Sequence, residues 1–549
     1  MNKRSRRATL ALAVLLITFK LCHAQQVPDD RVSRVDALFA NITREPGPGL
    51  AVAVVRDGKV ILRKGYGLAS IEHRVPITPA TVFDVASVAK QFTGFVVATL
   101  AAEGKIKLSD DIRTYIPELP NMGHRMTIAH LVHHTSGIRD WPGALLVGGW
   151  RLDDAITFNQ VLTIAYNQSE LMFVPGAEHS YSNTNYNLLA EMIRRVTGRS
   201  LRKWTDEDLF GPLKMTNTHF REYYTELISN RAAGYAMGSD RKYHHMPNSL
   251  TAVGSSSLFS TVDDLALWMI NMDQSTAAMS LAQTRGTLND GKKIDYAFGV
   301  IHGQYRGLPI LYHDGAWAGF GSLVVYFPGQ KFGIALLANS SSINVGDAAM
   351  KIADIYMEKE LAPAATQQDH DVPVVDVPIS VLRDYVGLYR LAPGSYVRIR
   401  LDGTKLTAEA TREKPIEMSA TSEREFSMNG GKITFQRDAK GNIDSLEYQG
   451  KRARKVDEPQ PAQLHEYDGE YESAELATSY RVASKTDSLE MHHRRHGTIP
   501  LTRLWRDDFG SHVAFMRSVE FQRNPDGRVT GFIVNSNDRN RNLRFVKRK

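Results

Sequence analysis

The C-terminal third of the chain contains the same landmarks twice, in the same order. Tyr385-Val-Gly-Leu-Tyr389 returns as Tyr467-Asp-Gly-Glu-Tyr471, and Phe435-Gln-Arg437 returns as Phe521-Gln-Arg523. Runs of alternating apolar and polar residues surround both sets, which is typical of antiparallel strands. Landmarks that recur in order at a nearly constant offset indicate a duplicated unit. We therefore expect two small antiparallel β-barrel-like domains, over residues 379–458 and 463–549.

A larger domain that mixes helices and strands is expected ahead of this pair. Residues 30–43 have the apolar spacing of one helix face, and 49–66 alternate around Asp57-Gly58 as a β-hairpin does. An amphipathic closing helix is expected over 346–361. The segment 362–378 is polar and contains three prolines, which predicts a linker. The expected domain therefore spans 25–361 and mixes helices and strands, in the α/β (α+β) class.

The first 24 residues have the layout of a secretory signal peptide. Basic residues precede an apolar run over 8–19, and Cys22-His-Ala24 precedes a plausible cleavage point at Gln25. The run is short for a bilayer span. We expect 1–24 to be removed and the protein to be periplasmic or secreted, with no membrane span after cleavage. An uncleaved N-terminal anchor is the alternative.

Removing this segment changes what the composition implies. It carries five basic residues and no acidic one, so the net charge falls from +7 to +2, which gives no argument for a nucleic-acid partner. The only cysteine, Cys22, leaves with it, which excludes disulfides and a cysteine nucleophile. The histidine-rich segment 492–496 includes two arginines that would repel a divalent cation, so we interpret it as a solvated or substrate-facing loop. No metal and no cofactor are expected.

Ser87-Val-Ala-Lys90 is the first candidate for chemistry. On a helix, residues i and i+3 share a face, so the lysine amine can lie beside the serine hydroxyl. Burial can keep part of such a lysine neutral, and a serine needs a neighbouring base to become a nucleophile. Two other Ser-x-x-Lys tetrads, starting at Ser200 and Ser239, have charged neighbours, whereas Ser87 has apolar flanks. The flanks favour Ser87 as nucleophile and Lys90 as its partner.

Two further segments supply groups that complement a serine nucleophile. In Tyr181-Ser-Asn183, the tyrosine could shuttle a proton and the amide could bind a substrate amide. In His313-Asp-Gly315, the glycine lets a substrate approach the backbone of a strand, and 310–327 is expected to form two strands joined by the glycine-rich stretch 315–321. His313 could donate to a substrate carboxylate or hold the proton network of the tyrosine. The backbone N–H groups of Ser87 and Ala316 are the candidate oxyanion hole.

Together these segments resemble the class C β-lactamase-like and penicillin-binding serine hydrolases. Ser87-x-x-Lys90, Tyr181-x-Asn183 and His313-x-Gly315 occur in the order used by that family, and the resemblance covers about residues 30–361. It implies a β-lactamase/transpeptidase-like fold, with a central antiparallel sheet flanked by helices. It also implies that Ser87 is the acylated nucleophile, with Lys90 and Tyr181 as acid and base. Which of the two deprotonates Ser87 stays open. The histidines of 130–137 are interpreted as scaffold.

The third motif narrows the substrate. β-Lactamases usually have Lys-Thr-Gly there, and the histidine form resembles D-alanyl-D-alanine carboxypeptidases, D-aminopeptidases and related esterases. The three-domain layout is similar to that of D-aminopeptidases, in which a loop of the last domain reaches the catalytic mouth. By that similarity Asp507 or Asp508 could receive a substrate ammonium.

The expected function is an exported serine hydrolase acting through a Ser87 acyl-enzyme on peptide, amide or ester substrates, foremost peptides that contain D-amino acids. Esterase or β-lactamase activity at the same site is one alternative. A non-catalytic penicillin-binding-like sensor or peptidoglycan-binding protein is an alternative of another class. The expected partner is a small peptide or ester, with a cell-wall origin left open, and the oligomeric state is not specified.

Overall fold

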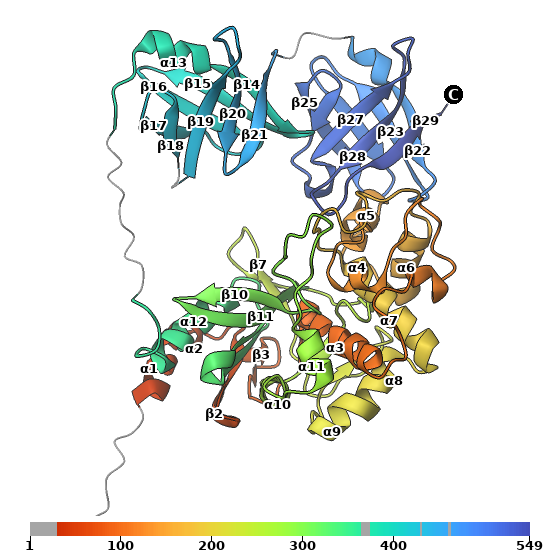
Figure 1. The fold of residues 1–549 in the computed structure, drawn as a ribbon, viewed down its shortest axis with the longest axis vertical. Helices are drawn as coiled ribbons and strands as arrows, with labels where there is room; N and C mark the ends of the chain where they lie inside the picture. The colour runs from red at the N-terminus through yellow and green to blue at the C-terminus, as the bar shows by residue number, and fades with distance from the viewer. Residues whose placement is uncertain (1–29, 364–373, 429–430, 459–462, 549) are drawn as a thin grey trace, which may run out of the picture.

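A computed structural model describes residues 30–363, 374–428, 431–458 and 463–548. Figure 1 shows three bodies: a large N-terminal domain and two β-barrels that lie side by side above it. This confirms the expected fold class, a mixed α and β domain followed by two small antiparallel barrels. The predicted signal segment 1–24 lies outside the described residues, as does most of the predicted linker.

A six-stranded antiparallel sheet forms the centre of the N-terminal domain. Its strands, in spatial order, are β10 (Ile301–Tyr305), β11 (Leu308–Trp317), β12 (Phe320–Phe327), β13 (Phe332–Ala338), β1 (Leu50–Arg56) and β2 (Lys59–Tyr66). Asp57 and Gly58 join β1 to β2 with positive φ angles of 50° and 72°, as a tight hairpin turn requires. The glycine-rich stretch does not all lie between strands: β11 continues through Gly315, and the turn falls at Ala318-Gly319.

Each face of this sheet packs against helices, because the strand residues that alternate along β1 and β13 are apolar on both sides. Ala51 and Ala53 face the core of α3 and α10, whereas Val52 and Val54 face the core of α1 and α12. The helices are α1 (Asp30–Leu38), α2 (Ala40–Arg44), α3 (Ala89–Ala102), α4 (Ile128–Val132), α5 (Trp141–Val147), α6 (Phe158–Tyr166), α7 (Asn183–Thr197), α8 (Leu201–Thr205), α9 (Gly211–Leu213), α10 (Val262–Asn271), α11 (Ala277–Ala282) and α12 (Val345–Tyr356).

Short strands and one helical turn complete the region between the helices and the sheet. They are β3 (Leu68–Ser70) with β4 (Val75–Pro76), β5 (Phe83–Asp84) with β9 (Leu258–Ser260) and β6 (His219–Phe220), β7 (Tyr235–Met237) with β8 (Tyr243–His245), and the 3₁₀ turn η1 (Ala86–Val88). η1 leads directly into α3 and lies against β11 and β12.

The two barrels are closed, and their cores contain the same arrangement of paired tyrosines. The first follows α13 (Ile379–Tyr385) and contains β14 (Gly387–Ala392), β15 (Ser395–Asp402), β16 (Lys405–Ala410), β17 (Ile416–Ala420), β18 (Glu425–Met428), β19 (Gly431–Arg437), β20 (Ile443–Tyr448) and β21 (Lys451–Val456). The second contains β22 (Gly469–Ser473), β23 (Thr478–Ser484), β24 (Leu489–His493), β25 (Gly497–Trp505), β26 (Asp508–Gly510), β27 (Ser518–Arg523), β28 (Val529–Asn535) and β29 (Leu543–Lys547).

The repeated tyrosines explain the repeat in the sequence. The Tyr389 hydroxyl donates to the Tyr385 carbonyl at 2.7 Å, and the Tyr471 hydroxyl donates to the Tyr467 carbonyl at the same distance. All four tyrosines are fully buried, where an unpaired hydroxyl would be costly. The repeated landmarks are therefore equivalent parts of two barrel cores.

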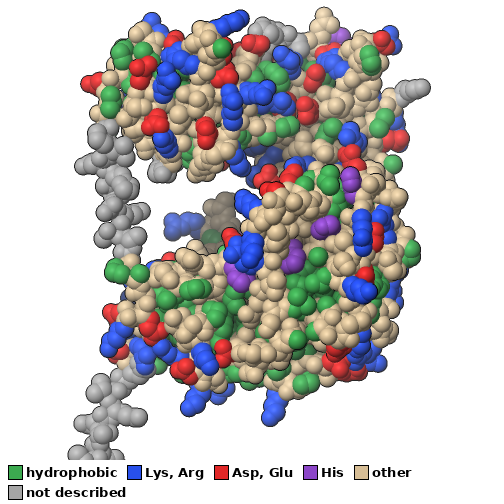
Figure 2. Space-filling view, viewed as in Figure 1, with side chains coloured by type: hydrophobic (Ala, Val, Ile, Leu, Met, Phe, Trp, Pro, Cys, Tyr) green, Lys and Arg blue, Asp and Glu red, His purple; other side chains and the backbone are tan. Residues whose placement is uncertain are grey.

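The second barrel docks on the N-terminal domain through α5. Ala144 and Val147 of α5 belong to the apolar core of that barrel, and the Tyr480 hydroxyl donates to the Val147 carbonyl at 2.9 Å. Around this apolar contact lie the ion pairs Arg495–Asp154 and Arg544–Glu170, and Figure 2 shows charged side chains of both signs gathered there. In the described part of the chain, no helix is long and apolar enough to cross a membrane.

Candidate active site

Ser87 lies at the turn between β5 and α3. The Asp84 carboxylate accepts from the Ala86 N–H at 2.8 Å, and Ala86 has a φ of 46°, a conformation that side chains rarely adopt. Ser87 is partly exposed, whereas its neighbours on both sides are buried. The turn therefore presents one hydroxyl at the surface of an otherwise apolar segment.

Lys90 contacts this hydroxyl from within the protein. Its Nζ lies 3.1 Å from Ser87 Oγ and donates to Asn183 Oδ1 and to the Ser255 carbonyl, both at 2.7 Å. Burial lowers the pKa of Lys90 to about 7, although Asp140 attracts the charged form. A neutral amine keeps two hydrogens for Asn183 and Ser255, which leaves its lone pair for the proton of Ser87.

Asn183 connects Lys90 to a buried carboxylate that sequence reasoning missed. Its Nδ2 donates to Asp140 Oδ1 at 2.9 Å, and its backbone N–H donates to the same oxygen at 2.8 Å. Burial raises the pKa of Asp140, and the bonds from Asn183 oppose that rise. The oxygen and the nitrogen of the Asn183 side-chain amide are thus both hydrogen-bonded within the protein. Asp140 follows the 127–138 segment without a motif of its own, so the sequence carried no sign of this role.

Tyr181 covers the other side of Lys90. The lysine Nζ lies 4.9 Å from the centre of the tyrosine ring. Burial raises the pKa of the Tyr181 phenol, while a hydrogen bond with Ser87 opposes that rise. The phenol is therefore protonated over the range in which Lys90 titrates, so it is available as a proton donor.

His313 is buried and both of its ring nitrogens have partners. Nδ1 lies 2.6 Å from the Asp314 carbonyl and must donate to it, so Nε2 accepts from the Tyr296 hydroxyl at 3.1 Å. Burial, reinforced by the charge of Lys90, lowers the pKa of His313 to about 4. The imidazole is neutral near pH 7 and orders the Tyr296 hydroxyl, a contact that the motif alone did not indicate.

Gly315 brings β11 against the nucleophile turn. A Cβ on Gly315 would lie 2.6 Å from the Val85 carbonyl oxygen and 2.8 Å from the Ser87 nitrogen, so only glycine fits this approach. The pairing of β10 with β11 ends at Tyr312, and no described strand pairs with that edge beyond it. The exposed Ala316, one residue further, lies on this open edge, which suits the expected oxyanion role of its N–H.

The histidines of 130–137 support the tyrosine loop from behind. His130 takes part in a capping box with Thr127 at the start of α4. His134 Nδ1 accepts from the Ser182 N–H at 3.2 Å, and its ring lies 4.4 Å from that of Tyr181. These contacts agree with their interpretation as scaffold.

The second barrel reaches this site with an arginine. In the β28–β29 loop, residues 536–542, the guanidinium of Arg539 lies 4.7 Å from the centre of the Tyr181 ring and 3.9 Å from Asp140 Oδ2. Asp507 and Asp508 are engaged elsewhere: Asp507 pairs with Arg523, and Asp508 accepts from the Tyr396 hydroxyl of the first barrel at 2.6 Å. The hypothesis that either one receives a substrate ammonium is therefore wrong, because their carboxylates serve contacts of the barrels.

The histidine-rich segment is also placed differently from the prediction. His493 is buried against Tyr480 and bonds Thr478, and His496 Nε2 donates to the Leu146 carbonyl of α5 at 2.8 Å. His493 and His496 therefore pack in the contact between the barrel and α5, whereas Arg494 and Arg495 are exposed, as a solvated loop would have them. Among the described residues, no group of three or more potential ligands is placed to hold a metal.

Comparison with known proteins gives two family matches. The family model described as beta-lactamase matches residues 35–356, which is more than half of the chain. A domain of unknown function, DUF3471, matches residues 372–452, which include α13 and the strands β14 to β20 of the first barrel.

Similar curated proteins include a D-aminopeptidase and Protein flp. A D-aminopeptidase of Gluconobacter oxydans is 27% identical over 319 residues, covering 57% of this chain and 60% of that protein. Protein flp of Staphylococcus aureus (strain N315) is 30% identical over 311 residues, covering 54% and 60%. The chain thus matches about three fifths of the length of these curated relatives.

Solved structures share the fold over about three quarters of this chain. The octameric penicillin-binding protein homologue from Pyrococcus abyssi has a TM-score of 0.55 at 21% identity, covering 77% of this chain and 100% of that chain. SurE has a TM-score of 0.52 at 22% identity, covering 78% and 99%. At these identities the likeness concerns the fold alone.

Proposed function

Because this chain belongs to the beta-lactamase family, we propose that it is an exported serine hydrolase that forms an acyl-enzyme at Ser87. Its substrates are peptides, amides or esters, foremost small peptides that contain D-amino acids. The observation that carries the proposal is the short contact between Ser87 and a buried lysine whose pKa is about 7. The resemblance to a D-aminopeptidase supports the substrate class.

The proposed reaction begins with Lys90 in its neutral form. Lys90 takes the proton of Ser87 while Oγ attacks the substrate carbonyl, and the N–H groups of Ser87 and Ala316 bind the oxyanion. The carbon–nitrogen or carbon–oxygen bond then breaks, and Tyr181 gives its proton to the leaving group and regains one from Lys90. In the second half, water loses a proton to the same pair as it attacks the acyl carbon. The bond between that carbon and Ser87 Oγ then breaks, and the pair returns the proton to Oγ.

Export is part of the proposal, on the basis of the N-terminal segment. Residues 1–24 have the basic and apolar regions of a signal peptide. We propose that the mature protein acts in the periplasm or outside the cell, on a small soluble substrate, with no nucleic-acid partner. Fractionation of cells that express the full chain, followed by N-terminal sequencing of the exported form, tests this point.

A covalent probe tests the central claim. A fluorophosphonate should add one adduct to the protein, measured by intact mass, and peptide mapping should place it on Ser87. Ser87→Ala should remove both the adduct and the hydrolysis of esters and D-amino-acid amides. Ser200→Ala is the matched control, because Ser200 opens another Ser-x-x-Lys tetrad and only caps α8 through the Lys203 N–H. Hydrolysis that survives in Ser87→Ala would end the proposal, and a protein that the probe never modifies would favour a non-catalytic sensor.

A further inference from the structure

The loop 536–542 of the second barrel is held in place at the candidate active site. The Asp140 N–H donates to the Arg539 carbonyl at 3.0 Å, and Ser180 Oγ donates to the Asp538 carbonyl at 3.1 Å. Both anchors belong to segments of the candidate site, because Asp140 bonds Asn183 and Ser180 directly precedes Tyr181. The loop is therefore attached to the same segments that carry the candidate catalytic groups.

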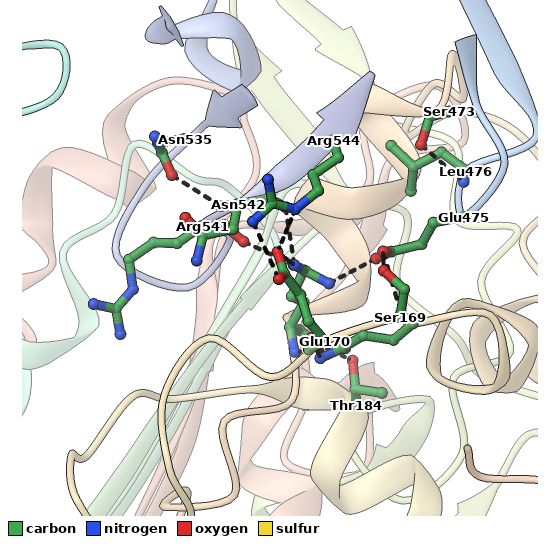
Figure 3. Close-up of polar contacts among 12 residues, drawn as sticks. Ser169, Glu170, Thr184, Ser473, Glu475, Leu476, Asn535, Arg541, Asn542 and Arg544 are labelled. Atoms are coloured by element: carbon green, nitrogen blue, oxygen red, sulfur yellow. Dashed lines mark hydrogen bonds and ion pairs between the residues drawn. The ribbon is translucent and has the colours of Figure 1, made fainter. Parts of the chain in front are cut away.

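Arg139 fixes the far end of this loop. Its side chain is 1% exposed and donates to the Arg541 carbonyl at 2.7 Å and to the Asn542 carbonyl at 3.0 Å. The same guanidinium pairs with Glu475 at 2.7 Å. Figure 3 shows Glu475, Asn542 and Glu170 facing one another across this contact. A buried arginine with fixed partners holds the loop before any substrate binds.

Arg539 is the cation that this anchored loop brings to the site. Its side chain is 49% exposed, and its nearest carboxylate oxygen, Asp140 Oδ2, lies 3.9 Å away, which is within ion-pair range but too far for a hydrogen bond. By contrast, Arg541 in the same loop pairs with Glu178 at 2.8 Å. The guanidinium of Arg539 therefore keeps donors available beside Tyr181.

The imidazole of His313, in the third motif, cannot act as the cation that binds a substrate carboxylate. His313 is neutral near pH 7, and its two nitrogens are bound to the Asp314 carbonyl and the Tyr296 hydroxyl. A substrate carboxylate near Ser87 would need a cation from another element, and Arg539 is placed to be that cation. Its guanidinium lies 4.7 Å from the centre of the ring of Tyr181, the residue proposed to protonate the leaving group.

We propose that Arg539 is a specificity-determining residue, which binds a carboxylate on the leaving group of the substrate. This inference rests on the proposed function. It favours carboxypeptidase-like cleavage, in which the departing amino acid carries its own carboxylate, over substrates with a neutral leaving group. The second barrel then supplies part of the substrate site.

Matched substrates test this assignment. We choose the N-acetyl-D-alanyl ester of 3-hydroxybenzoate and the corresponding ester of 3-hydroxybenzamide, which differ only in the charge of the leaving group. The wild type should have the higher kcat/KM on the carboxylate ester. Arg539→Gln should lower kcat/KM on the carboxylate ester about 10- to 100-fold more than on the amide ester. A smaller loss common to both esters is also expected, because the charge of Arg539 helps to lower the pKa of Lys90. Arg539→Lys should retain part of the preference.

Arg541→Gln is the control for the loop, because that side chain pairs with Glu178 instead of facing Tyr181. It should keep the wild-type preference. Equal losses on both esters in Arg539→Gln, or no preference in the wild type, would overturn the role of Arg539. Failure of the proposed function has a different signature: neither ester is hydrolysed by the wild type and Ser87 takes no fluorophosphonate adduct.

Discussion

At the scale of single residues, the main result is the environment of Lys90. Burial removes water from around the amine and disfavours its charged form, so the pKa of Lys90 falls to about 7. The pKa of Tyr181 moves in the opposite direction for the same reason. Burial thus makes Lys90 the better base and keeps Tyr181 protonated as an acid. This favours Lys90 over Tyr181 for the deprotonation of Ser87.

This separation predicts a pH dependence. The base must be deprotonated, so kcat/KM should rise about tenfold per pH unit below 7 and level off above it. Measuring ester hydrolysis between pH 5 and 9 checks this expectation. A rate that does not change across pH 7 would exclude Lys90 as the base.

Replacing the lysine separates its proton chemistry from its charge. Lys90→Arg keeps a cation that does not lose its proton near neutral pH, so hydrolysis should fall by about 10²- to 10⁴-fold. Lys203→Arg is the control, because Lys203 is exposed in the other tetrad on α8 and should have no effect. Activity that persists in Lys90→Arg would assign the base to another group.

At the scale of elements, the site depends on how closely β11 approaches η1. The Ser322 hydroxyl donates to the Val85 carbonyl at 2.7 Å, which ties β12 to the same turn. Since Gly315 leaves no room for a side chain there, the distance between the open strand edge and Ser87 is set by backbone contact.

Gly315→Ala should therefore impair acylation more than it impairs folding. The added methyl group would move β11 or η1, which should slow fluorophosphonate labelling about 100-fold and cost about 1–3 kcal/mol of stability. A time course of labelling measures the rate of acylation, and thermal unfolding measures the stability. Gly329→Ala is the control, because a Cβ at Gly329 would meet no atom within 4 Å. Labelling at the wild-type rate in Gly315→Ala would show that the close approach is not needed.

At the scale of the whole molecule, the second barrel and the N-terminal domain share structure. α5 contributes Ala144 and Val147 to the core of the barrel, and the barrel returns the loop 536–542 to the site. The first barrel contacts the second through Tyr396 and Asp508, and the Asp508 pKa is raised by burial there. Docking of the last domain therefore brings the loop 536–542 against the candidate site.

Arg139→Met should weaken this docking. Removing the guanidinium takes the cation from Glu475, 9% exposed, which keeps only its bonds from Ser169, and the donor from two loop carbonyls. The expected cost is about 3–5 kcal/mol. Limited proteolysis should then cut near the second barrel faster, and hydrolysis should fall with it. Arg544→Met is the control, because Arg544 pairs with Glu170 at the exposed rim and should cost about 1 kcal/mol or less. Equal effects of the two variants would argue against Arg139 as the anchor.

The sequence by itself determined the features of this protein that depend on neighbouring residues and on the order of repeated segments. The hairpin at Asp57-Gly58 and the paired tyrosines of the barrels follow from periodicity, turn chemistry and repetition, which are properties of neighbouring residues. The pairing of Ser87 with Lys90 follows from helical spacing, and the apolar flanks of Ser87 distinguished it from Ser200.

Only the tertiary structure decided which distant groups meet at the site. Asp140, Tyr296 and Arg539 have no motif, and their roles arise from burial and from contacts between segments far apart in the chain. Asp507 and Asp508 were expected to contact substrate by similarity to D-aminopeptidases, yet their partners lie in the barrels. The proton affinity of Lys90 likewise depends on the tertiary structure, because its pKa is set by burial in the fold and not by the tetrad that contains it.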